Sequence, residues 1–238
     1  MTSSEPATVA LPADLLAAED QMLKAVEAAI QSGDGRRWSA SLRFENLRML
    51  PVALRLARSL VASGQSLAMV WPDAGAAALA RRDAEDLSAC IQDFNQLKRS
   101  ATEEPDERLL LAVMPTPADY EDFQPLCEAH AGPVLMLNGR LEDAAVGIGS
   151  VARERRKGFV ASWKQAYWLQ PLDGGALLRC YPDDWRVYRQ DPDGYRQVSV
   201  QSSRPDPDTT AALLAGEDPD GIKQQLGSVD RFLDGLRN

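Results

Sequence analysis

Three short, uniformly apolar runs constrain the fold of this 238-residue chain more than any other feature of its sequence. They cover residues 67–71, 109–114 and 134–137, and Pro, Gly or Asp bounds each of them. Strands that are apolar on both faces are typical of a parallel sheet covered by helices on both sides. Helix-length segments join the runs. The pattern therefore predicts an α/β fold whose N-terminal part is a three-layer, mostly parallel, Rossmann-like sheet.

The segments around these runs repeat their apolar side chains with periods that predict helices and one further strand. Residues 14–32 repeat apolar side chains at helical spacing, and Gly33 ends that helix. Residues 38–45 alternate apolar and polar, which predicts a half-buried strand near a sheet edge. Further helices are expected over residues 51–62, 74–82, 86–97 and 119–130.

The pattern changes after about residue 158, where short aromatic-rich segments alternate with turns rich in Asp, Gly and Pro. We expect an antiparallel meander that either continues the parallel sheet or packs beside it. Its strands are predicted over residues 159–169, 176–181, 185–189 and 195–200, and closing helices over 209–214 and 221–236. The predicted organisation is a disordered segment 1–13 and one α/β domain 14–238, divided into a parallel part 14–158 and a meander part 159–238.

Charge and cysteine content narrow the class of partner. The net charge of -9 argues against a nucleic-acid partner, because phosphate binding needs a basic surface. No apolar stretch approaches the length of a transmembrane helix, so peripheral contact is the form of membrane association left open. Three scattered cysteines and the absence of a signal-peptide pattern in residues 1–10 predict a reducing, cytoplasmic location.

Few residues suggest catalysis. The one histidine, His130, ends a predicted helix, where a solvent-facing or capping role is expected. Neither a GxSxG elbow, a GxxxxGK[ST] loop nor a full GxGxxG motif is present. One histidine and three separated cysteines do not predict a metal site, and no cofactor is expected. The sequence therefore favours a non-enzymatic protein, although it leaves a general acid–base enzyme open.

Two groups of residues are candidate binding sites. Ligands of open α/β sheets bind beyond the carboxyl ends of the strands, where Asp73, Gly75, Asn138 and Arg140 lie. Asp73 is also a natural helix N-cap, which is the stronger interpretation, and Arg140 could clamp a carboxylate or pair with a neighbouring acid. The second group is a partner surface on the C-terminal sheet, because Trp and Arg dominate interface hot spots, although core packing is the alternative. Its residues are Trp163, Trp168, Arg179, Trp185 and Arg186.

Five stretches carry a family resemblance: residues 43–45, 50–55, 73–83, 133–143 and 175–182. They resemble the domain of unknown function 1995 family of cyanobacteria and plastids, over about residues 14–200. The resemblance implies a relation to plant assembly factors of the low photosystem II accumulation type, and to a domain appended to a plant adenylate kinase. It supplies no catalytic residues. Without a transit peptide, a cyanobacterial origin is expected.

Together these observations lead to an expected function and an alternative. The expected function is a non-enzymatic accessory or assembly factor for photosynthetic complexes that docks on a photosystem subunit or assembly protein. It would work in the cytoplasm, with peripheral contact to the thylakoid membrane left open. The alternative is a small-ligand module that binds a nucleotide or carboxylated metabolite at the carboxyl ends of the parallel strands. A third possibility, a hydrolase or transferase, would need a carboxyl group with a strongly raised pKa.

Overall fold

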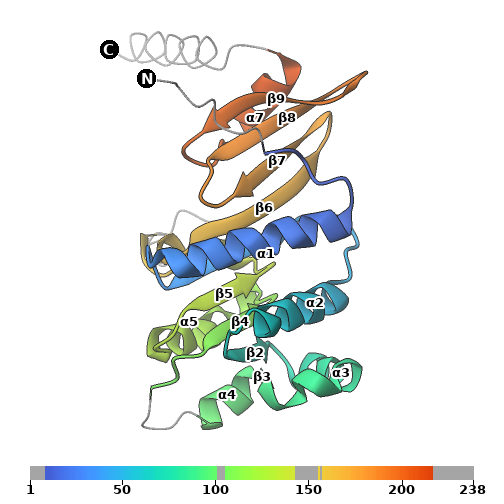
Figure 1. The fold of residues 1–238 in the computed structure, drawn as a ribbon. Helices are drawn as coiled ribbons and strands as arrows, with labels where there is room; N and C mark the ends of the chain where they lie inside the picture. Colours follow the sequence, from blue (N-terminus) through green and yellow to red (C-terminus); the bar gives the residue numbers. More distant parts are fainter. Residues whose placement is uncertain (1–8, 101–104, 143–154, 156, 217–238) are drawn as a thin grey trace, which may run out of the picture. The chain divides into compact units, whose positions relative to one another are not determined.

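The computed structural model describes residues 9–100, 105–142, 155 and 157–216 (Figure 1). The chain divides into two compact units, which are treated separately below. The first unit holds the residues up to Leu169 together with Cys180–Pro182. The second unit holds Gln170–Arg179 and the residues from Asp183 onward.

The strands form one sheet in the order β3-β2-β4-β5-β1-β6-β7-β8-β9. The pairings of β2 with β3 and β4, of β4 with β5, and of β1 with β5 and β6 are parallel. The pairings of β7 with β8 and of β8 with β9 are antiparallel. The predicted α/β class is thus confirmed, and the meander continues the sheet. The strands are β1 (Arg37–Leu42), β2 (Leu67–Trp71), β3 (Ile91–Asp93), β4 (Leu109–Val113), β5 (Val134–Leu137), β6 (Lys164–Leu172), β7 (Gly175–Cys180), β8 (Trp185–Asp191) and β9 (Gly194–Gln201).

The helices cover both faces of the parallel part. One face of β2, β4 and β5 packs against α4, α5 and Phe159 in a buried cluster that includes Phe123. Alternate strand residues such as Met69 and Leu111 are buried on the other face, and α1 and α2 lie across the near face in Figure 1. The described helices are α1 (Leu15–Ser32), α2 (Met49–Ala62), α3 (Ala74–Asp83), α4 (Phe94–Ser100), α5 (Tyr120–Ala129) and α7 (Pro207–Ala215), with 3₁₀ turns η1 (Glu85–Cys90), η2 (Pro117–Asp119) and η4 (Val160–Ser162).

The prediction for β1 was wrong in its position. The strand lies between β5 and β6 in the middle of the sheet, and residues 38–42 are all buried. Its serines suggested a solvent-facing side, yet Ser39 and Ser41 are only 7% and 3% exposed. A serine is small enough to fit under packed neighbours when its hydroxyl has a partner, and the Ser39 hydroxyl donates to Gln165 Oε1 at 3.0 Å.

Two further predictions were wrong in their element type. Residues 86–97 do not form one helix, because η1 leads into the short strand β3 and then α4. The strand predicted from residue 159 begins at Lys164, since Phe159 packs in the core and η4 precedes the strand. The predicted helix 221–236 and the disordered segment 1–13 lie wholly or largely outside the described residues.

The second unit is built around the antiparallel strands. The ladder between β8 and β9 shifts register between Val187 and Tyr188: Val187 pairs with Ser199 and Tyr188 with Gln197, so Val198 is an extra residue on β9. Helix α7 begins where the Asp206 carboxylate accepts from the Thr209 N–H at 2.7 Å. A Cβ on Gly175 would lie 2.2 Å from the Tyr188 carbonyl oxygen of the neighbouring strand β8, so the backbone there leaves room for glycine but not for a larger residue.

No helix in the described part of the chain is long and apolar enough to cross a membrane.

Candidate functional site

The carboxyl ends of β1, β4 and β5 lie together in the first unit and carry unusual backbone. Asn46, Met114 and Asn138 have positive φ angles of 54°, 54° and 51°. Left-handed non-glycine residues are uncommon and often mark functional loops. The Met114 N–H donates to the Leu137 carbonyl, and the Asn138 N–H to the Ala40 carbonyl, both at 2.8 Å. These bonds hold the three strand ends in one edge.

The Asn138 side chain joins β5 to β1. Its Oδ1 accepts from the Leu42 N–H at 2.6 Å, and its Nδ2 donates to the Leu42 carbonyl at 2.9 Å. The same Nδ2 lies 3.1 Å from Met49 Sδ. The carboxamide therefore imitates a peptide group and adds one rung to the ladder, which leaves it no amide hydrogen for a ligand.

The residues beside Asn138 are also used within the fold. Arg43 Nη2 donates to the Gly139 carbonyl at 2.9 Å, and the Arg43 guanidinium lies 4.5 Å from the centre of the Trp168 ring. A Cβ on Gly139 would lie 2.3 Å from Met136 Sδ. A larger residue at this position would force the Met136 side chain to move.

The Asp73 carboxylate caps α3, as the capping interpretation predicts. It accepts from the Ala76 N–H at 2.9 Å. A Cβ on Gly75 would lie 3.1 Å from the same carboxylate, so Gly75 makes room for the cap. The structure places Asp73 and Gly75 after β2, and Asn138 and Arg140 after β5, with β4 between those strands.

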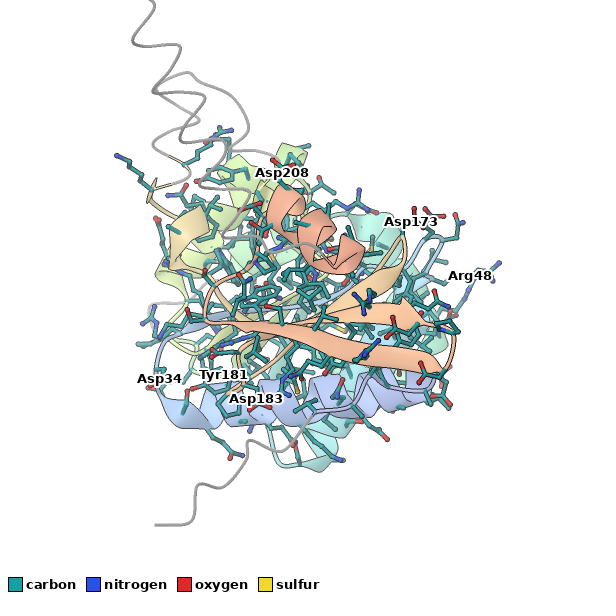
Figure 2. All side chains as sticks on the ribbon, turned by 90° about the horizontal axis from the view of Figure 1, so that it is seen from above. Asp34, Arg48, Asp173, Tyr181, Asp183 and Asp208 are labelled. Carbon is teal, nitrogen blue, oxygen red and sulfur yellow. The ribbon has the colours of Figure 1, made fainter. Side chains whose placement is uncertain are left out.

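Four of the exposed side chains along this edge form what we call the carboxyl-edge surface. Phe44 and Met114 are 37% and 42% exposed, which is high for large apolar side chains. Arg48 and Arg140 are exposed as well, and Arg48 points away from the protein in Figure 2. Apolar and arginine side chains of this kind are enriched at protein interfaces.

The tryptophans of the predicted partner surface are core residues. In the first unit Trp168 is buried, and half-buried Trp163 stacks on Phe123 with ring centres 5.8 Å apart. In the second unit Trp185 is buried, Arg186 is buried, and Arg179 is half-buried. These rings do not form an exposed surface, because apolar neighbours in β6 and β8 are buried with them.

Three carboxyl groups of the described residues are paired with arginines. Hydrogen bonds from Arg58 and Arg108 lower the pKa of Asp86 and Asp106, respectively. Hydrogen bonds from Arg189 and Arg196 lower the pKa of Asp191 in the same way. None of these three carboxyls has the raised pKa of a general acid. Burial raises the pKa of the Cys127 thiol, which disfavours the reactive thiolate.

His130 has one of the two predicted roles, since it caps a helix, but it does not face solvent. It is the C-cap residue of α5, but it is buried, and its Nε2 lies 2.8 Å from the Arg108 carbonyl. Its side chain thus joins α5 to the segment before β4. Among the described residues, no group of three or more His, Cys, Asp or Glu side chains could hold a metal ion.

A hollow in the second unit was not predicted. It has a volume of about 900 Å³ and lies between the meander and α7. Its polar lining includes Asp173, which Figure 2 shows at the tip of the β6–β7 hairpin, together with Arg204 and Asp206. Sequence periodicity shows which face of a strand or helix is apolar, but not that two apolar faces are held apart. The apolar lining consists of Leu172, Gly174, Leu177, Pro205, Pro207, Ala211, Leu214 and Ala215.

Comparison with known proteins identifies the family. No curated protein and no solved structure matches the chain. One family model, described as a domain of unknown function, does match, and it covers residues 12–212. That span includes α1, all nine strands of the sheet and the start of α7. The chain belongs to the DUF1995 family.

Proposed function

We propose that this protein is a non-enzymatic accessory factor that assists the assembly of photosynthetic complexes by docking on a partner protein. The carboxyl-edge surface is the docking site. The observation that carries this proposal is the exposure of Phe44 and Met114 on backbone that is held in fixed positions. The resemblance to plant assembly factors, noted from the sequence, supplies the class of partner.

The geometry of the edge favours docking because the surface is preorganised. Hydrogen bonds fix the strand ends on which Met114 and Arg140 stand, including the Arg140 N–H to the Pro115 carbonyl at 2.9 Å. A surface that is already ordered loses little conformational entropy when a partner binds. Exposed apolar side chains beside arginines suit a partner segment that combines apolar and acidic residues.

A ligand module at the same strand ends has less support. The Asp73 carboxylate caps α3, and the Asn138 carboxamide is bonded to Leu42. Of the four residues predicted for that site, Arg140 has an exposed cationic side chain.

The test is affinity purification of a tagged chain from a photosynthetic cyanobacterium, with soluble and membrane fractions analysed separately by mass spectrometry. We expect photosystem subunits or membrane-insertion factors to be enriched with the unmodified chain. Phe44→Ser and Arg140→Glu should each reduce that enrichment at least about five-fold, because central interface residues typically contribute ~1 kcal/mol or more.

The matched control is Val61→Ser. Val61 is 45% exposed at the end of α2, a helix that begins after β1 and runs back along the sheet. This change removes an exposed apolar side chain from the opposite edge and should leave enrichment unchanged. Equal recovery of photosystem proteins by all three variants would rule out the carboxyl-edge surface. Recovery of the chain without any photosynthetic or membrane-assembly protein would rule out the proposed function.

A further inference from the structure

The hollow in the second unit has apolar walls on two sides. Leu172 and Leu177 line it from the sheet, and Leu214 and Ala215 line it from α7. All of these residues belong to the second unit, so the hollow is a property of that unit by itself. Removing apolar surface from water is favourable, so these walls favour an apolar occupant.

The charged part of the lining does not suit an anion. The Asp206 carboxylate accepts from the Thr209 N–H at 2.7 Å and from the Thr209 hydroxyl at 2.9 Å. The Thr210 hydroxyl donates to the Asp206 carbonyl at 2.8 Å. The charged residues of the lining are Asp173, Asp206 and Arg204, so the lining is net acidic. An apolar occupant that carries basic side chains at the rim therefore fits better than an acidic one.

The chain itself continues from one wall of the hollow. Helix α7 ends at Ala215, and Gly216 caps it with a positive φ of 79°. A left-handed C-cap turns the chain away from the helix axis. Residues 217–221 are as long as the connections that join neighbouring helices. The segment that follows therefore starts within one short connection of the hollow.

That segment, residues 222–236, lies outside the described residues, and its sequence has an apolar stripe at helical spacing. Gly227 and Gly235 interrupt it, and glycine lowers helix propensity. A helix here would therefore depend on packing its stripe against another surface rather than on its own propensity. The stripe consists of Ile222, Leu226, Val229, Phe232, Leu233 and Leu236.

The charge of the segment is opposite in sign to that of the lining. Among residues 221–238, the basic side chains of Lys223, Arg231 and Arg237 outnumber the acidic side chains of Asp230 and Asp234. Attachment to α7 also keeps the segment at a high local concentration beside the hollow, which a separate molecule does not have.

We propose that residues 222–236 fold back along α7 and fill the hollow with their apolar stripe. The occupant is this segment of the same chain, and a small molecule or a second copy would have to displace it. The contact belongs wholly to the second unit. It is independent of the carboxyl-edge surface, which belongs to the first unit.

The test is hydrogen–deuterium exchange of the full-length chain, followed by mass spectrometry of its peptides. Amides of residues 222–236 should exchange at least about ten-fold more slowly than in an unstructured chain, because packing protects them. Ala211→Asp should raise their exchange rate at least about five-fold, since it adds a carboxylate to an apolar wall. Ala78→Asp is the matched control and should leave that rate unchanged, because Ala78 is an exposed alanine within α3 of the first unit.

The reciprocal variants change the segment instead of the hollow. Leu226→Ser combined with Leu233→Ser should raise exchange in α7 about three- to ten-fold, because the two contacting elements stabilise each other. Gln224→Ser combined with Arg231→Ser changes the opposite face of the predicted helix and should leave α7 unchanged. Peptides of β8 should keep their exchange rate within about two-fold in all variants, which separates loss of the contact from loss of the fold.

Three results would overturn the proposal. The first is exchange of residues 222–236 at the rate of an unstructured chain. The second is an equal response to Ala211→Asp and Ala78→Asp together with an unchanged α7 in the reciprocal leucine variant. The third is protection that disappears on dilution, which would assign the occupant to a second copy.

A small molecule as the occupant is tested with N-phenyl-1-naphthylamine, a neutral fluorescent probe. The unmodified chain should not bind this probe saturably, whereas the variant with serine at both leucine positions should. Saturable binding by the unmodified chain that Ala211→Asp abolishes would show that the hollow is open, and would overturn the proposal.

Discussion

Asn138 at the carboxyl edge of the first unit and Arg186 in β8 of the second unit differ in how completely their polar side chains are hydrogen-bonded. At the edge, the Asn138 carboxamide bonds both backbone groups of Leu42. In β8, the buried Arg186 donates to Gln197 at 2.9 Å, but its Nε has no hydrogen-bond partner among the described residues, and Asp183 lies 3.6 Å from Nη2. Among the described residues, the buried nitrogen atoms without a hydrogen bond include the indole nitrogens of Trp71 and Trp163 in the first unit and guanidinium nitrogens of Arg43 in the first unit and of Arg179 and Arg186 in the second.

The difference teaches where polarity stabilises this protein and where it does not. A neutral amide that completes a ladder contributes two hydrogen bonds without the cost of burying a charge. A buried guanidinium with incomplete bonding carries a desolvation cost that its partners only partly offset. Substituting Asn138 should therefore lower the free energy of unfolding strongly, whereas substituting Arg186 in β8 should lower it little or even raise it.

The largest effect is expected at Asn138. Asn138→Ala should lower the free energy of unfolding by about 2–4 kcal/mol, because it leaves two backbone groups of Leu42 without partners and because alanine adopts positive φ less readily than asparagine. Chemical denaturation monitored by circular dichroism measures the change. Asn138→Gly removes the hydrogen bonds but relieves the backbone, so it should cost less than alanine. A loss under about 0.5 kcal/mol for both variants would show that the carboxamide does not support the edge.

Gly139→Ala should cost about 1–3 kcal/mol through overpacking, because its Cβ would lie 2.3 Å from Met136 Sδ. The double variant with Met136→Ala is the control. Met136→Ala removes the obstructing side chain, so the two changes should couple, and the double variant should lose less stability than the single losses added together. Additive losses would mean that the close contact with Met136 is not what selects glycine.

The smallest effect, and the one that could change sign, is expected in β8. Arg186→Met should change the free energy of unfolding by less than about 1 kcal/mol or should stabilise the protein, because it replaces a buried charge with an apolar side chain of similar length. Asp183→Ala, which leaves the arginine in place, should be more destabilising than Arg186→Met. The opposite order in denaturant titrations would remove the contrast between the two regions.

The sequence predicted the strands that are covered by helices on both faces. It misplaced or missed strands whose burial depends on the hydrogen bonds of polar side chains or on tertiary packing. β2 and β5 begin and end where their apolar runs do, because a strand covered on both faces has no polar positions. β1 was predicted near a sheet edge because serine in an alternating pattern normally indicates a solvent-facing position. Ser39 is instead buried, with its hydroxyl hydrogen-bonded. β3 was missed because three residues are too short to show a period.

The candidate sites were predictable to a similar extent. The predicted strand ends indicated Asp73 and Asn138 as site residues, and both lie at the carboxyl edge. Sequence spacing could not show that their side chains form hydrogen bonds to the backbone. The exposure of Phe44 and Met114 and the hollow beneath α7 arise from tertiary packing. Aromatic content alone could not separate the buried Trp168 from a surface residue.

The extra residue on β9 bears on how this protein behaves at high concentration. β9 ends the strand order, so one side of its backbone has no neighbouring strand in the described sheet, and Tyr195 and Val200 are 54% and 50% exposed. Such an edge is a template for uncontrolled addition of further chains, the first step toward aggregates. The additional residue at Val198 interrupts the regular spacing of N–H and C=O groups that an incoming strand must match. We therefore expect the extra residue Val198, which shifts the register of the ladder, to disfavour the pairing of further strands with β9.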